Sequence, residues 1–144
     1  MTPRANNLQI ARNEASALKA RAERLRCGRA AAPVLRELSA SVAFLELRLR
    51  FLPDDACLHA DQSIVLYPAA TAYFGFPCPY GDCDGIYDLT EVARSALRCP
   101  IPKVSGTLTC EGSRSRHRIP GRACGLEVRY TVTVERTAID AATS

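Results

Sequence analysis

The stretch Cys124-Gly-Leu-Glu-Val-Arg-Tyr-Thr-Val-Thr-Val-Glu-Arg136 carries the clearest strand pattern in the chain. Apolar residues alternate with charged or hydroxyl residues along it, which is the period of a half-buried β-strand. The apolar set is Leu126, Val128, Tyr130, Val132 and Val134, and Cys124 has the same phase. The stretch therefore predicts a strand with one buried face and a cysteine at its start.

Working outward, three more segments complete a predicted antiparallel sheet. The segment 103–110 predicts a strand that ends at Cys110. The segment 64–76 predicts one strand, bent or interrupted at Pro68, because proline cannot donate to a sheet ladder. Upstream, an alternating run predicts a strand with an apolar face and a polar face. Its inward set is Ala43, Leu45, Leu47, Leu49 and Phe51, and its outward set is Phe44, Glu46, Arg48 and Arg50.

Two helices are predicted. The first covers about residues 5–27 and ends at Gly28, with small and apolar residues recurring every three or four positions. This seam is Leu8, Ala11, Ala15, Leu18, Ala22 and Leu25, and Arg12, Lys19, Arg21, Arg24 and Arg26 fall on the solvent side. A seam of this kind fits docking on the chain's own sheet or pairing with a second copy in a homodimer.

The second helix follows Asp88-Leu-Thr-Glu91, which has the form of a capping box, and it runs to about Arg98 before Pro100. Its buried stripe would be Leu89, Val92, Ala93, Ala96 and Leu97. Together these elements predict an α+β fold. We expect an N-terminal amphipathic helix within residues 1–30, a single α+β domain over 34–136 with about four strands and a zinc knuckle, and a loose tail over 137–144.

Composition and length place the chain among ordinary globular proteins. It has 144 residues, of which 47% are apolar and 24% charged. Neither a secretion signal nor a run of eighteen apolar residues appears, so we expect a cytoplasmic protein with no membrane partner. Seven cysteines cannot all pair within one chain, and reduced thiols are free to bind a metal.

Four of these cysteines form the candidate metal site. Cys78 and Cys83 flank the turn Cys78-Pro-Tyr-Gly-Asp-Cys83-Asp-Gly85, which resembles the turns of zinc-ribbon and knuckle proteins. Cys110 and Cys124 are separated by thirteen residues and would be brought together by a hairpin. The four thiolates predict a closed, structural zinc site. Cys99 and His117 are the substitutes if one ligand is misassigned.

A calcium loop is the alternative metal reading. Counting Tyr80 as position one, acidic residues or glycine occupy positions three, five, six, nine and twelve. These residues are Asp82, Asp84, Gly85, Asp88 and Glu91. Tyr80 cannot supply the first carboxylate, and Asp82 and Asp84 could simply be solvated. The pair Cys57 and His59 supplies two possible ligands but not a complete metal site.

Charge is segregated along the chain. Residues 1–36 and 94–136 each carry an excess of six positive charges, whereas residues 54–91 hold seven acids and no Lys or Arg. The basic residues between Cys110 and Cys124 are Arg114, Arg116, His117, Arg118 and Arg122. Arginine forks and serine hydroxyls suit phosphate oxygens.

Three functions remain open from these patterns. The favoured one is a small, non-enzymatic, zinc-stabilised module that binds nucleic acid or another acidic partner through its Arg-rich loop. The alternative is a protein–protein adaptor or chaperone that uses the acidic segment 54–91. The third is a thiol or metal-dependent enzyme served by Cys57 or Cys99. No phosphate loop, nucleophile elbow, metalloprotease helix or dinucleotide fingerprint supports catalysis.

Overall fold

The computed structural model describes residues 3–52, 61–99, 101–113 and 124–137, and it confirms the predicted α+β class. The helices are α1 (Pro3–Ala31), α2 (Leu35–Leu38) and α3 (Thr90–Arg98). The strands are β1 (Val42–Leu52), β2 (Asp61–Leu66), β3 (Gly75–Pro77), β4 (Ile86–Asp88), β5 (Lys103–Thr109) and β6 (Glu127–Arg136).

The main sheet has four antiparallel strands in the order β2-β1-β6-β5. The predicted alternation in β6 and β1 is confirmed, because Leu45, Leu47, Val128 and Val132 are fully buried. Ala43 departs from it. The register of β1 shifts between Val42 and Phe44, so Val42 is buried and Ala43 only half-buried. A bulge of this kind moves every preceding residue to the other face.

The prediction of one strand over 64–76 is wrong, since the stretch divides between two sheets. β2 ends at Leu66, and β3 pairs with β4 in a separate two-stranded sheet. Between them the chain turns toward α2, where the N–H of Arg36 donates to the carbonyl of Pro68 and the N–H of Leu35 to that of Ala70. These carbonyls bond to the α2 segment, and the chain leaves the main sheet before it reaches β3.

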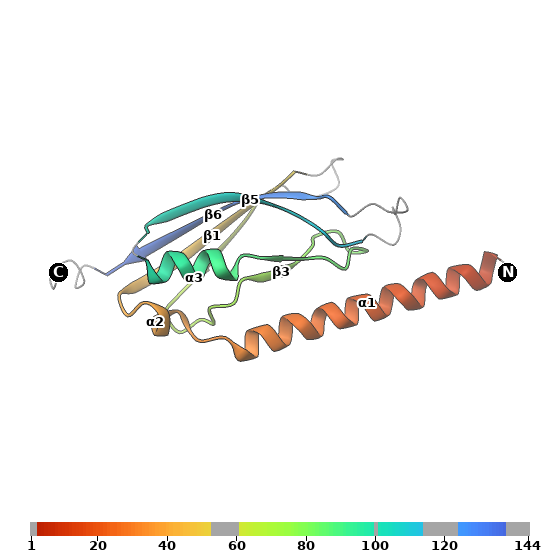
Figure 1. The fold of residues 1–144 in the computed structure, drawn as a ribbon, viewed down its shortest axis with the longest axis horizontal. Helices are drawn as coiled ribbons and strands as arrows, with labels where there is room; N and C mark the ends of the chain where they lie inside the picture. The colour runs from red at the N-terminus through yellow and green to blue at the C-terminus, as the bar shows by residue number, and fades with distance from the viewer. Residues whose placement is uncertain (1–2, 53–60, 100, 114–123, 138–144) are drawn as a thin grey trace.

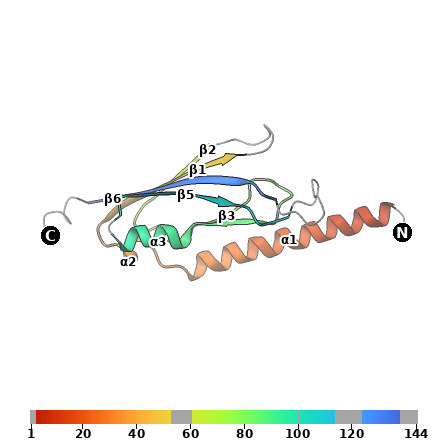
Figure 2. The same ribbon diagram turned by 45° about the horizontal axis from the view of Figure 1, so that its top comes forward.

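The elements form layers, with the main sheet on one side (Figure 1). α2, α3 and the two-stranded sheet lie against one face of it, and α1 lies outside β3, as a second view also shows (Figure 2). Among the described residues, no helix or strand covers the opposite face (Figures 1 and 2). The main core therefore sits between the sheet and α3, with Leu89, Ala93, Ala96 and Leu97 buried on the predicted stripe of that helix.

The predicted capping box with Asp88 at the helix entry is not formed, because the N-cap of α3 is Leu89, which makes no side-chain cap bond. The carboxylate of Asp88 accepts a hydrogen bond from the backbone N–H of Thr90 at 2.9 Å. The Thr90 hydroxyl in turn accepts one from the N–H of Phe74 at 3.0 Å. This second bond joins the start of α3 to the residue that precedes β3.

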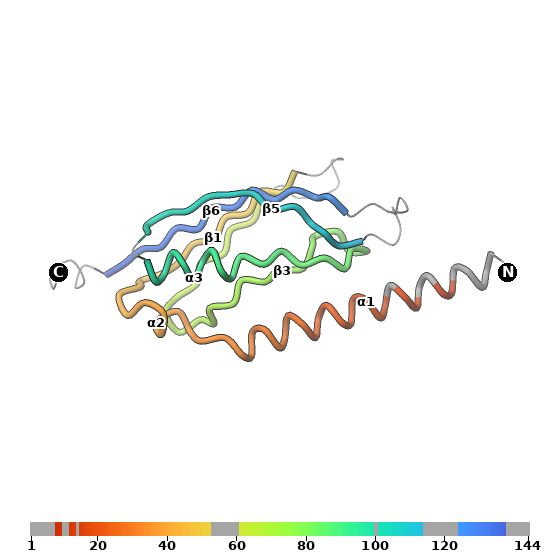
Figure 3. Tube along the Cα trace, viewed as in Figure 1, coloured from red at the N-terminus to blue at the C-terminus, as the bar shows by residue number. Residues whose placement is uncertain are grey.

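The first helix is longer than predicted and docks along a different line. It passes through Gly28 and ends at Ala31, just before Pro33, whose ring disfavours helical backbone at the residue before it. Gly28 is a contact residue instead, because a Cβ there would lie 2.5 Å from the ring of Tyr73. Leu25 is buried, whereas Leu8 is 56% exposed. The N-terminal part of α1 extends past the end of the sheet (Figure 3).

Candidate metal centre

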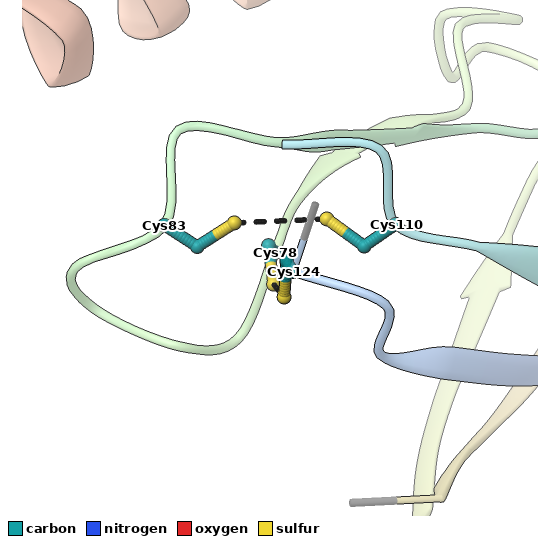
Figure 4. Close-up of side chains that lie close together, drawn as sticks. All are labelled: Cys78, Cys83, Cys110 and Cys124. Atoms are coloured by element: carbon teal, nitrogen blue, oxygen red, sulfur yellow. Dashed lines mark hydrogen bonds between the residues drawn. The ribbon is translucent and has the colours of Figure 1, made fainter. Parts of the chain in front are cut away.

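The four predicted cysteines converge at one end of the main sheet. Cys78 follows β3, Cys83 lies in the turn before β4, Cys110 follows β5, and Cys124 precedes β6. Their sulfur atoms all lie within 4.8 Å of one another, and together they could hold a metal ion. Cys83 Sγ is 3.6 Å from Cys110 Sγ, and Cys78 Sγ is 4.0 Å from Cys124 Sγ (Figure 4).

Two of these separations are compatible with a tetrahedral zinc site. Four sulfurs at about 2.3 Å from a tetrahedral zinc ion lie about 3.8 Å from one another, and the separations of 3.6 Å and 4.0 Å bracket that value. Cys78, Cys83 and Cys110 are buried and Cys124 is half-buried. Four cysteine ligands are the composition of closed structural zinc sites, whereas catalytic sites use three protein ligands and a water.

The turn that holds Cys78 and Cys83 is fixed by its own backbone. The N–H of Cys78 donates to the carbonyl of Gly85 at 2.9 Å, and the N–H of Cys83 donates to the carbonyl of Tyr80 at 3.1 Å. The N–H of Gly85 also points at Cys83 Sγ, 3.3 Å away. An N–H donor at this position stabilises a thiolate, which is the form that binds metal.

Position 85 requires glycine because another loop approaches its backbone closely. A Cβ on it would overlap Cys110 Sγ and lie 3.2 Å from the backbone of Gly112. The sequence predicts that Gly85 serves a tight turn, whereas the structure shows that the position requires glycine because two loops are in contact there. The only positive φ in the described chain is at Gly125, where φ is 74°.

The other two cysteines lie at the base of a hairpin. The N–H of Cys110 donates to the carbonyl of Leu126 at 2.8 Å, and that of Gly125 to the carbonyl of Cys110 at 3.0 Å. The N–H of Cys124 then reaches the carbonyl of Gly112 at 2.6 Å. These bonds close the chain on either side of the segment that contains the predicted Arg-rich loop.

Asp84 ties the knuckle turn to that hairpin. Its carboxylate accepts the N–H of Ser113 at 2.7 Å, and its own N–H donates to the Ser113 carbonyl at 3.2 Å. The expectation that Asp82 and Asp84 are simply solvated is therefore wrong: Asp84 bridges two loops, and Asp82 is 9% exposed. The surroundings of both acids depend on the geometry of the folded turn, which the sequence pattern alone does not reveal.

The thiols share their protons unequally. Hydrogen bonds from Cys78 and Cys83 lower the pKa of Cys110 to about 4. The pKa of Cys78 is raised, first by its hydrogen bond to Cys110, and the pKa of Cys124 is raised, first by burial. The pKa of Cys83 is raised as well, first by its hydrogen bond to Cys110. Binding of zinc would release the remaining protons and would weaken as the pH falls.

Helix α1 makes a contact with the knuckle that the sequence analysis missed. The guanidinium of Arg21 donates a hydrogen bond to the backbone carbonyl of Cys83. Arg21 was predicted on the solvent side, and this is wrong because the docked line of α1 passes through Leu18, Arg21, Leu25 and Gly28. These four residues recur every three or four positions, so the sequence predicts this docked face once Gly28 is treated as a contact residue.

The remaining candidate ligands do not join the cluster in the part of the chain that is described. Cys99 and Cys27 are exposed free thiols. Cys57, His59, Arg114, Arg116, His117, Arg118 and Arg122 lie outside the described residues.

The calcium loop is not assembled. Within the described ranges, the four cysteines are the one group of three or more ligating side chains that converge. Asp88 lies in β4 and binds the N–H of Thr90, and the carboxylate of Asp84 is bound to Ser113.

No helix in the described residues is both long enough and apolar enough to cross a membrane. No protein-family model, curated protein or solved structure matches this chain.

Proposed function

We propose that the chain is a non-enzymatic module in which zinc, held by Cys78, Cys83, Cys110 and Cys124, fixes an Arg-rich segment that binds nucleic acid. The observation that carries the proposal is the convergence of four sulfurs within 4.8 Å from four separate points of the chain. Such a site links the knuckle, β5 and β6 in one place. Zinc would act there as a structural cross-link, with no step of chemistry assigned to it.

The kind of partner is inferred from the Arg-rich segment that lies between the cross-linked cysteines. Residues 114–122 contain four arginines and a histidine, and the hairpin bonds at Cys110 and Cys124 close the chain around them. Arginine guanidiniums and serine hydroxyls contact phosphate oxygens and fix position without reading base sequence. Affinity for a nucleic acid would therefore depend strongly on salt and weakly on sequence.

The test measures binding of the full, zinc-loaded chain to a fluorescein-labelled twenty-nucleotide oligothymidylate over a range of salt concentrations. Arg116→Ala with Arg118→Ala should weaken binding roughly tenfold, which is about 1.4 kcal/mol. The matched control is Arg36→Ala with Arg98→Ala, which also removes two exposed positive charges but lies on α2 and α3. Both variants should keep their zinc.

Two outcomes would contradict the proposal. Equal losses in the loop variant and the control would mean that only total charge matters. Absence of oligonucleotide binding by the zinc-loaded wild type, at low salt, would remove the function itself.

A further inference from the structure

The uncovered face of the main sheet carries three arginines at the end near the metal cluster, and two of them face each other across neighbouring strands. The register places Arg50 of β1 directly opposite Arg129 of β6, with Asp61 of β2 on one side and Thr107 of β5 on the other. In the next row, Arg48 lies between Ser63 and Thr131. Like charges directly opposite in a sheet are destabilising, so this arrangement costs stability in the free protein.

Two of the three arginines have a carboxylate nearby, and the third has none. Arg48 pairs with Glu46 at 2.6 Å, and Arg50 lies 4.0 Å from Asp61. Among the described residues, no carboxylate lies within ion-pair distance of Arg129, Glu127 on the same strand included. The side chains of Arg48 and Arg50 are 70% and 66% exposed. An incoming anion would meet uncompensated positive charge at Arg129.

This face is also hollowed. A cavity of about 530 Å³ is lined by all three arginines together with Asp61, Ser63 and Thr131, among others. The charged lining residues are three arginines and one aspartate, a net charge of +2. Among the described residues, no aromatic side chain lines it, so this part of the lining offers no platform for base stacking. Guanidinium forks beside hydroxyl groups fit phosphate oxygens instead.

The hollow lies at the end of the main sheet where Cys110 and Cys124 flank the Arg-rich segment. Arg129 follows Cys124 by five residues, and β6 begins at Glu127, so this row lies at the same end of the sheet as the metal cluster. Arg50 is close to the end of β1 on that side.

We propose that the hollow between Arg48, Arg50 and Arg129 is a second binding site for the phosphodiester backbone of the same nucleic acid. The inference rests on the proposed function for the identity of the polymer. It adds a separate site on different elements, with its own variants. Because neither site reads base edges, the module would bind along the backbone of a single strand with little sequence preference.

The experiment uses the same labelled oligothymidylate and the full zinc-loaded chain. Arg50→Gln with Arg129→Gln should weaken binding roughly tenfold and reduce the slope of log K against log salt by about 1.4, at about 0.7 per lost phosphate contact. The control pair Arg36→Gln with Arg98→Gln should leave both quantities nearly unchanged.

A single substitution separates binding from folding. Arg129→Glu replaces a like-charge pair by opposite charges facing Arg50, which should keep or raise the free energy of unfolding. The same substitution should weaken oligonucleotide binding more than Arg129→Gln does. If Arg129 had only a structural role, Arg129→Glu would not weaken oligonucleotide binding while it keeps or raises the free energy of unfolding.

The outcomes distinguish the two proposals. Weaker oligonucleotide binding by Arg50→Gln with Arg129→Gln, but not by Arg116→Ala with Arg118→Ala, supports the sheet site and contradicts the loop site. If only Arg116→Ala with Arg118→Ala weakens binding, or if Arg129→Glu binds like the wild type, the sheet site is wrong and the proposed function is unaffected. If the wild type binds anionic phospholipid vesicles but no oligonucleotide, both proposals are wrong.

Discussion

The hydroxyl of Tyr87 donates a hydrogen bond to the backbone carbonyl of Leu126, 2.7 Å away, and this carbonyl also accepts the N–H of Cys110. The bond joins β4 to the start of the last strand, next to the cysteine cluster. Tyr87 is 2% exposed, and its ring lies 5.9 Å from that of Phe51. A buried phenol therefore helps to hold the two sheets together at the metal end.

Removing this hydroxyl should destabilise the fold. Tyr87→Phe keeps the ring and loses the hydrogen bond, at a cost of about 1 kcal/mol in the free energy of unfolding. Denaturant unfolding at pH 7 measures it. Tyr67→Phe is the matched control, because Tyr67 is 63% exposed. Equal effects at both positions would contradict a specific role for the Tyr87 bond.

Tyr87 should also make stability depend on alkaline pH. Burial, followed by the nearby cysteines, raises the pKa of Tyr87 above its ordinary value of 10.0. Its contribution is therefore complete below about pH 10, and it is lost as the pH rises further because the unfolded chain ionises first. Between pH 9 and pH 11, the wild type should lose more stability than Tyr87→Phe. Parallel loss in the two proteins would count against this assignment.

Zinc content should depend on the clustered cysteines only. Protein purified without chelator should contain about one zinc per chain, and Cys83→Ser should lose it and unfold at a lower temperature. Cys99→Ser should keep both zinc and melting temperature, since Cys99 is an exposed free thiol. Elemental mass spectrometry and thermal unfolding give the two readouts. A metal-free wild type, or zinc loss in Cys99→Ser, would refute the site.

Two glycines of the knuckle should respond differently to the same change. Gly85→Ala would place a methyl group against Cys110 Sγ and the Gly112 backbone, and we expect a loss of about 1–3 kcal/mol together with weaker zinc retention. Gly81→Ala meets nothing within 4 Å and should change stability by less than about 0.5 kcal/mol. Chemical unfolding of the zinc-loaded variants decides between these expectations.

Two leucines of α1 test how that helix packs. Leu25→Ala should cost about 2 kcal/mol, because Leu25 is 8% exposed, whereas Leu8→Ala should be nearly neutral if the helix docks only on its own chain. Analytical ultracentrifugation of the wild type and Leu8→Ala tests the predicted homodimer. A dimer that dissociates in Leu8→Ala would show that the exposed part of α1 pairs with a second copy.

The local elements could be read from the chain because their side-chain periods are local properties. Alternation identified β1 and β6, the sequence Asp88-Leu-Thr-Glu91 located the start of α3 to within a residue or two, and the turn around Gly85 marked Cys78 and Cys83 as a pair. These predictions need only the neighbours of each residue. They were weakest at Ala43, where a register shift changed the face, and over 64–76, where backbone bonds to α2 moved half of an expected strand into another sheet.

By itself, the sequence determined the fold class, most strand and helix positions, and the four cysteines that meet. Only the tertiary structure decided that Gly28 and Arg21 contact the rest of the chain, that Asp84 bridges two loops, and that Arg50 faces Arg129 across two strands. The physical reason is distance along the chain. Hydrophobic period is set by residues a few positions apart, whereas these contacts join residues tens of positions apart and depend on register and close approach.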